Sequence, residues 1–167
     1  MEFKDVIYKR RSNRFLNNKK IKDEDLDYIL EIAQRAPVGM GKYENIRLVL
    51  LEGEALEKVK AEFVKDAQRD VSYNGGALIY ILHRGISNDI NNQDGGCIAQ
   101  NICLAAAERD IGSVYLWSVT RFNNNETINK LLQRKENEAI VCAVTLGYKT
   151  SEQVSGATHQ IEILKVK

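Results

Sequence analysis

Five stretches of the chain repeat their apolar residues at helical spacing. In each stretch apolar side chains recur every three or four positions, which places them on one face of a helix. Residues 95–109 are apolar almost all round, as in a central helix that is covered on more than one side, and a second subunit is one way to cover it. The predicted helices are residues 2–9, 23–35, 54–67, 95–109 and 125–134.

Five further stretches are short apolar runs of strand length. Residues 139–146 contain no charged side chain, which indicates a strand that is buried on both faces. The helices and strands are interspersed without regular alternation, so we expect an α+β fold, with helices flanking one sheet, rather than a doubly wound fold. At 167 residues the chain is expected to form one domain, residues 1–167. The predicted strands are residues 46–51, 77–82, 113–119, 139–146 and 161–166.

The charge balance and the cysteines narrow the class of protein. There are 24 Lys and Arg residues against 23 Asp and Glu, a net charge of +1. The electrostatic field of so small a net charge recruits neither nucleic acid nor an anionic membrane. Any anion site must therefore be local. No apolar run approaches the roughly 20 residues of a membrane span, and the first residues lack the apolar core of a secretion signal. Cys97, Cys103 and Cys142 stand in apolar surroundings, so we expect reduced core thiols without a redox role in a cytoplasmic protein.

A cluster of cations follows the first predicted helix. Residues 9–14 (KRRSNR) place four cations and one hydroxyl within six positions. Guanidinium groups bind phosphate through paired hydrogen bonds, so the cluster fits an anion that carries several oxygens. Arg10 and Arg14 would share one face if the helix continued through them. The alternative is an ordinary solvated basic patch.

Other side chains supply little catalytic equipment. Two glycines in the loop 37–41 allow backbone to approach a ligand closely, but the loop follows a helix and lacks a nucleotide-binding fingerprint. His83 and His159 have no cysteine or carboxylate at metal-ligand spacing, so no metal site is expected, and we interpret His83 as structural. If the protein is an enzyme, a cofactor is expected to carry the chemistry.

A series of motifs, taken in order, resembles the nitroreductase family of flavin mononucleotide (FMN) enzymes and covers most of the chain. Residues 10–15 (RRSNRF) are similar to the family's Arg-x-Ser-x-Arg-x-Phe opening. Residues 95–107, followed by Ile111-Gly112-Ser113, resemble its central helix and the Gly-Leu-Gly that ends it. The remaining motifs are residues 33–37 (AQRAP), 73–77 (YNGGA) and 146–148 (LGY).

The resemblance implies a homodimer with FMN at the subunit interface and a central, mostly antiparallel sheet of four to five strands between helices. It also implies that the C-terminal strand, residues 161–166, crosses to the partner's sheet. By motif position Arg10, Ser12 and Arg14 contact the flavin, with Arg11 as an additional contact. Arg10 would face the phosphate, and Arg14 the ribityl chain and the pyrimidine edge, where a fixed cation stabilises the reduced flavin.

Two loops are expected to face the flavin as well. After the second helix the family usually carries Ser, Asn and Gln side chains that this chain lacks, so contacts there are expected from backbone atoms. In the second loop, which follows the predicted strand at Trp117 and Ser118, a backbone N–H is expected to reach flavin N5. The alternatives are an ordinary turn for the first loop, and core packing for its methionine and for the tryptophan of the second. The expected contacts are Pro37, Val38, Gly39, Met40, Trp117 and Ser118, and Lys165 or Lys167 is a candidate for the basic phosphate contact of the family's tail.

The resemblance therefore implies an FMN-dependent oxidoreductase. NADH or NADPH would reduce the flavin, leave, and be replaced by a small acceptor such as a nitroaromatic compound or a quinone, in ping-pong order. The chemistry would take place on the flavin, with no catalytic side chain, and the choice between NADH and NADPH stays open. A second hypothesis is a flavin-binding or sensing protein with little turnover. A third, a basic-patch module for nucleic acid, is disfavoured by the balanced charge.

Overall fold

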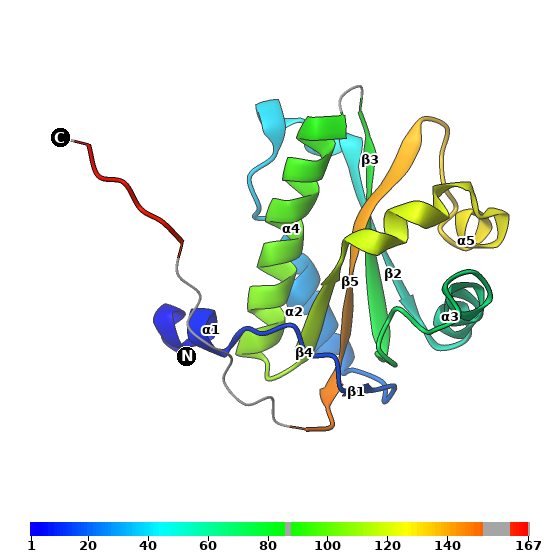
Figure 1. Cartoon of the computed structure of the whole chain (residues 1–167), viewed down its shortest axis with the longest axis horizontal. Coiled ribbons are helices and arrows are strands. Elements are labelled where there is room, and N and C mark those ends of the chain that lie inside the picture. Colours follow the sequence, from blue (N-terminus) through cyan, green and yellow to red (C-terminus); the bar gives the residue numbers. More distant parts are fainter. Residues whose placement is uncertain (86–87, 152–160, 167) are drawn as a thin grey trace.

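The computed structural model describes residues 1–85, 88–151 and 161–166. Figure 1 shows a sheet with helices on both sides. The helices are α1 (Phe3–Lys9), α2 (Asp23–Ala33), α3 (Gly53–Ala67), α4 (Asn88–Glu108) and α5 (Glu126–Leu131). The strands are β1 (Leu16–Asn17), β2 (Ile46–Glu52), β3 (Ala77–Arg84), β4 (Gly112–Leu116) and β5 (Glu138–Lys149). Short 3₁₀ turns span Gly39–Gly41, Tyr43–Asn45 and Trp117–Asn124.

The five strands form one sheet in which every strand pairing is antiparallel. Strand β5 lies at its centre and pairs with β1, β3 and β4, while β2 pairs with β3. The long apolar run at 139–146 fits this position, because elements packed on both faces of the sheet bury the side chains of β5 on either face. The predicted α+β fold with four to five mostly antiparallel strands is therefore confirmed.

The sheet divides the core into two layers, and strand β3 contributes side chains to both. Its side chains alternate between the two faces of the sheet, as the pleat requires. Ala77, Ile79 and Ile81 pack in the cluster under α2 and α4. Leu78, Tyr80 and Leu82 pack in the cluster on the other face, under α3 and the segment from β4 to α5. Figure 1 shows α2 and α4 on one side of the sheet and α3 and α5 on the other.

Helix α4 starts earlier than the sequence pattern predicts. The polar residues 88–94, which we interpret from sequence as a connection, form its first two turns. The reason is tertiary, since Asn91 and Asp94 are buried against neighbouring elements in spite of their polarity. Helix α1 ends at Lys9, as the pattern predicts, so Arg10 and Arg14 share no helix face. The chain then forms a bridge to β4 at Ser12.

Three further predictions of local structure need correction. Residues 161–166 (red in Figure 1) form no strand within the single chain, because no strand among the described residues lies beside them. Strand β1 was missed, since its residues fall within a polar connection and it consists of only two residues. Trp117 and Ser118 lie in a 3₁₀ turn rather than in the strand that precedes it. A short segment forms a strand only where the edge of another strand lies beside it, and the sequence does not reveal that neighbour.

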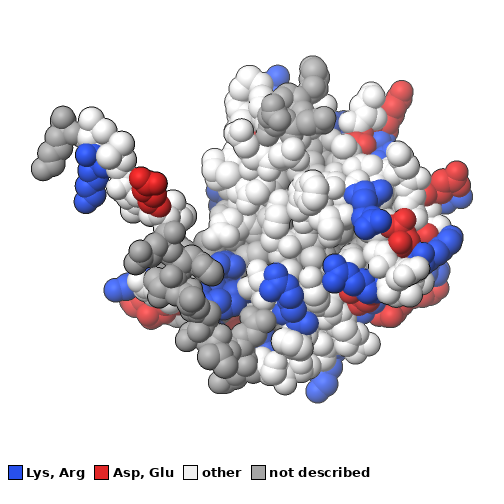
Figure 2. Space-filling model, in the orientation of Figure 1, with Lys and Arg blue, Asp and Glu red and all other residues white. Residues whose placement is uncertain are grey.

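Charged side chains are unevenly distributed over the surface. Figure 2 shows a broad face over α4 that is almost free of them. In the sequence, α4 has no charged residue between Gly95 and Ala107. An uncharged face of this kind is typical of a surface that another subunit covers. Among the described residues, no helix is both long enough and apolar enough to cross a membrane.

The start of α5 allows a direct test of this fold. The Asn125 side-chain oxygen accepts a hydrogen bond from the Ile128 backbone N–H (2.9 Å), and its amide nitrogen donates to Glu62 on α3 (2.7 Å). We expect Asn125→Ala to lower the free energy of unfolding by about 1 kcal/mol, because the helix loses its cap. Urea denaturation measures the change. The adjacent, exposed Asn124→Ala is the control, and an equal loss in both variants would contradict the capping role.

Candidate functional site

The basic stretch lies beside a cavity between α4 and β4. After α1 ends, the backbone N–H of Asn13 donates to the Ser113 carbonyl (2.9 Å), which holds the chain against β4. Arg10 and Ser12 consequently line a cavity of about 340 Å³. The other residues that line it are Gly96, Ala99, Gln100, Cys103, Ser113 and Tyr115.

The lining of this cavity has no side chain at Gly96 and mixes polar residues with the apolar Ala99 and Cys103. A Cβ atom built on Gly96 would meet no atom within 4 Å, so bare backbone is presented at this point of α4. Burial and, to a smaller extent, the nearby Cys142 together raise the pKa of the Tyr115 hydroxyl to about 12. Tyr115 therefore keeps its proton at neutral pH and is available as a donor. The cavity combines a cation, hydroxyl groups and the bare backbone of Gly96, which suits a planar ligand with an anionic end.

The other two arginines of the stretch do not line this cavity. Arg11 donates from Nη1 to the Arg10 carbonyl (2.9 Å), and the Arg14 guanidinium lies 5.9 Å from the ring centroid of Tyr73. Of the four residues that the motif singles out, the single chain therefore brings together Arg10 and Ser12. Sequence reasoning missed Gly96, Gln100 and Tyr115. Two signals point to them, the helical spacing of 96, 100 and 103 and the strand alternation of 113 and 115.

The glycine loop lies at a different place. Gly39 and Met40 line a second cavity, of about 560 Å³, together with His83 and Asp94. Val38 lines a third, and Pro37 is exposed. Met40 is 77% exposed, so it does not fill the core. The single chain thus places the loop and the basic stretch at two different cavities.

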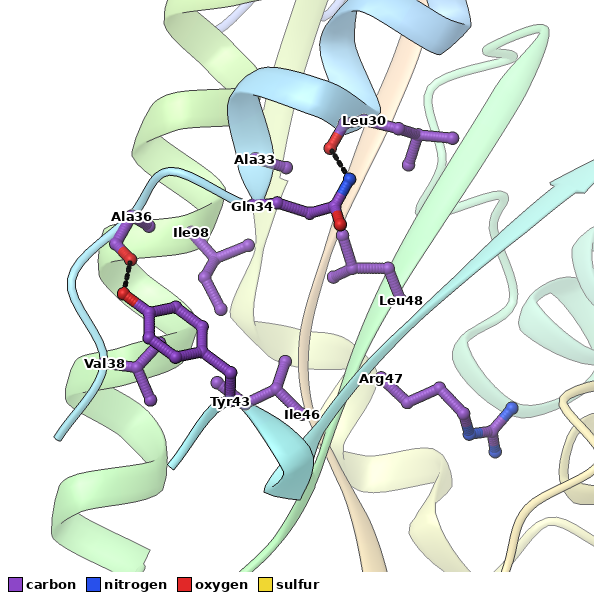
Figure 3. A pocket seen from close by; sticks show the side chains of 10 residues that line it. All are labelled: Leu30, Ala33, Gln34, Ala36, Val38, Tyr43, Ile46, Arg47, Leu48 and Ile98. Carbon is purple, nitrogen blue, oxygen red and sulfur yellow. Dashed lines mark hydrogen bonds between the residues drawn. The ribbon is translucent and has the colours of Figure 1, made fainter. Parts of the chain in front are cut away.

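The third cavity, of about 590 Å³, lies between α2 and the outer strand β2. In Figure 3 the Tyr43 hydroxyl donates to the Ala36 carbonyl (3.1 Å) and closes one end. Apart from Gln34 and Arg47, the lining side chains are apolar or aromatic, and the Arg47 guanidinium points away from the cavity (Figure 3). This cavity is therefore an apolar groove beside a strand that pairs on one side only among the described residues.

The remaining candidates are exposed. Trp117 is 64% exposed, so core packing within this chain does not explain it, and Ser118 beside it is exposed as well. Lys165 is exposed, while Lys167 and His159 lie outside the described residues. A role of Trp117, Ser118 or Lys165 beside a flavin stays a prediction.

The cysteines agree only in part with the prediction of core thiols. Cys103 and Cys142 are buried, and burial raises the pKa of both thiols, that of Cys142 to about 12. Thiols with a raised pKa stay protonated and react slowly. Cys97 is exposed, which corrects the prediction, because it lies on the uncharged outer face of α4 rather than on the face against the sheet.

Comparison with known proteins shows to which family the chain belongs. A model of the nitroreductase family matches residues 7–73 and 67–148. The chain belongs to the nitroreductase family. It is also 30% identical, over 151 residues, to an Archaeoglobus fulgidus protein provisionally named NADH dehydrogenase/NAD(P)H nitroreductase, covering 89% of this chain and 86% of that one. The family inferred from the motifs is thereby confirmed.

Solved structures of other nitroreductases share the fold. A nitroreductase with bound FMN from Desulfitobacterium hafniense superposes with a TM-score of 0.84 at 22% identity, covering 100% of both chains. A nitroreductase with bound FMN from Bacteroides fragilis gives a TM-score of 0.77 at 25% identity, covering 99% of this chain and 95% of that one.

Proposed function

We propose that this nitroreductase is an FMN-dependent oxidoreductase that takes electrons from NADH or NADPH and passes them to a small acceptor such as a nitroaromatic compound or a quinone. The observation that carries the proposal is the cavity in which Arg10 and Ser12 meet the bare backbone of Gly96. A guanidinium and a hydroxyl suit the phosphate of FMN, and a wall without a Cβ suits a flat ring. Both features needed for that cofactor are therefore present in this chain.

The residues of this chain bind and orient rather than react. Arg10 and Ser12 would hold the phosphate, and Arg14 would lie along the ribityl chain and the pyrimidine edge. FMN, when bound, supplies the hydride chemistry. Tyr115 would donate a hydrogen bond from its protonated hydroxyl, since its pKa of about 12 keeps it neutral at physiological pH. No acidic or basic side chain is assigned a proton-transfer step.

A homodimer would complete the site. The cavity of Arg10 and the loop of Gly39 are separate in one chain, so the partner's loop would close the cavity of the first subunit. The uncharged face of α4 supports an interface there (Figure 2). Exposed aromatic and apolar side chains add to it, among them Met40, Ile90, Tyr115 and Trp117. The unpaired state of the three cysteines supports a cytoplasmic location.

The C-terminal tail would hold the dimer together. Its apolar side chains Ile161, Ile163, Leu164 and Val166 are 78–86% exposed. Among the described residues β2 has a neighbour on one side only, and the apolar groove of Figure 3 lies beside it. A tail strand from the partner would pair with β2 and cover the groove.

Removal of residues 161–167 tests that arrangement. We expect the truncated chain to dissociate at least roughly tenfold more readily, because four apolar side chains lose their burial in the partner. Sedimentation equilibrium measures the dissociation constant. Ile163→Ser is expected to weaken the dimer in the same direction and Glu162→Ser far less. A tail-less chain that associates as tightly as the full one would rule out the exchange.

The proposed activity is tested by absorbance and by turnover. The purified chain is mixed with FMN, excess is removed, and the visible flavin bands are expected at about one flavin per chain. NADH or NADPH is then expected to bleach these bands without oxygen, and a quinone to restore them. Bands that NAD(P)H does not bleach would favour the flavin-binding or sensing protein. A chain that takes up no FMN would contradict both.

A further inference from the structure

A buried acid–histidine pair lies directly behind the glycine loop. Asp94 on α4 and His83 at the end of β3 are only 6% and 5% exposed. One carboxylate oxygen of Asp94 lies 3.3 Å from His83 Nε2, and the other accepts a hydrogen bond from the Gly39 backbone N–H (2.8 Å). A hydrogen bond to a buried carboxylate is stronger than one between neutral groups. Asp94 therefore anchors the loop to the core by a charged contact.

The anchor fixes how close the loop lies to α4. A Cβ atom built on Gly39 would approach the Ile90 side chain to 2.9 Å and an Asp94 oxygen to 3.5 Å. Only a glycine brings its N–H this near to the helix without displacing side chains. Gly39 and Asp94 consequently act together, one by its lack of a side chain and the other by its charge.

In the same loop the backbone N–H of Met40, like that of Val38, has no acceptor among the described residues. The N–H groups of Gly39, Gly41 and Lys42 donate to Asp94, the Val38 carbonyl and the Gly39 carbonyl. The N–H of Met40 donates to no other residue within the described part of the chain. Met40 also has a φ of +54°, in the left-handed region that a residue with a side chain rarely adopts. Strain of this kind persists only where the surroundings impose it, and the Asp94 contact restrains the residue directly before Met40.

We propose that Asp94, supported by His83, is a positioning residue that presents the Met40 N–H as a hydrogen-bond donor to the flavin bound between subunits. This inference rests on the proposed function. A backbone donor has no rotamer of its own, so its direction must come from the residues that hold the loop. The buried, charged Asp94 supplies that direction.

The first test uses the flavin-free protein. Amide hydrogen exchange of Gly39, followed by NMR, is expected to become at least tenfold faster in Asp94→Ala, because the anchored N–H loses its acceptor. Asp94→Asn keeps an oxygen that can accept from Gly39 but lacks the charge. Its Gly39 exchange rate is expected to lie between those of the wild type and Asp94→Ala. His83→Gln breaks the pair but leaves the Asp94–Gly39 bond, so it separates global destabilisation from release of the loop. The exposed Asp66→Ala, on the far side of the sheet, is the matched control.

The second test adds FMN. In the wild-type chain the Met40 amide signal is expected to move downfield saturably as FMN binds, and Asp94→Ala is expected to raise the dissociation constant of FMN about tenfold. Unchanged Gly39 exchange in Asp94→Ala would overturn the anchoring role. A Met40 signal that does not move in an FMN-saturated chain would overturn the donor role. If the chain binds no FMN, the proposed function and the donor role fail together, while the exchange of Gly39 still decides the anchor.

Discussion

Arg10→Ala/Arg14→Ala protein is expected to emerge from purification and incubation with FMN without the visible absorbance of a flavin. Arg10 lines the cavity next to Ser12, and Arg14 lies four positions further along the chain. Each charge-assisted hydrogen bond contributes about 1.5–3 kcal/mol, so loss of each arginine weakens binding roughly tenfold to a hundredfold. Quantitative titration of FMN, followed by quenching of its fluorescence, gives the dissociation constants of the double and single variants.

The matched control removes the same charge elsewhere. Lys65 and Arg69 are also four positions apart, are exposed, and lie at the end of α3 on the other face of the sheet. Their replacement by alanine is expected to leave FMN affinity unchanged, which separates a specific site from a general effect of net charge. Equal affinity of the Arg10/Arg14 variant and the wild type would eliminate the basic stretch as the phosphate site. If Arg10→Ala lowers FMN affinity and Arg14→Ala does not, Arg14 contacts Tyr73 rather than FMN.

Arg47→Met is expected to destabilise the fold by about 3–5 kcal/mol. The Glu138 side chain is 1% exposed, and Arg47 Nε donates to it at 3.0 Å. Arg47 also donates to the carbonyls of Leu132 (3.0 Å) and Gln133 (3.1 Å). Removal of the guanidinium leaves a buried carboxylate without its main partner, and desolvation of that charge is then uncompensated. Urea denaturation at a fixed protein concentration measures the loss, since a dimer's stability depends on concentration.

The double variant Arg47→Met/Glu138→Leu is expected to recover most of that loss, because no buried charge remains. Arg35→Met, which breaks an exposed pair with Glu31 on α2, is expected to change stability far less. A double variant as unstable as Arg47→Met would show that packing, rather than the unpaired carboxylate, accounts for the effect.

The same pair predicts how stability depends on pH. Arg47 holds the pKa of Glu138 below its ordinary value, although burial opposes this. A lowered pKa in the folded state means that the stabilisation is fully present above the ordinary glutamate pKa of about 4.3. It is lost as the pH falls through the lowered value. We therefore expect the wild type to lose more stability on acidification than the double variant, and parallel pH profiles would contradict this.

Local sequence patterns were sufficient to predict those helices and strands whose own apolar residues determine which face is buried. The continuous apolar runs at β3 and β5 and the amphipathic spacing of α2 and α3 predicted these elements to within a few residues, because each must bury a face. The basic stretch and the glycine loop were likewise recognisable as motifs. The start of α4 was not, because Asn91 and Asp94 are polar residues that become buried only through contacts distant in sequence.

Sequence by itself determined the family through the order of its motifs and the α+β class through periodicity, and it predicted which residues would bind an anion. Only the tertiary structure decided which of them meet. It joined Arg10 and Ser12 to Gly96 and Tyr115, which lie about 85 to 105 positions further along the chain, and it separated them from Gly39. It also brought Asp94 to the Gly39 N–H. The physical reason is that such contacts depend on strand register and helix packing, which no local pattern encodes.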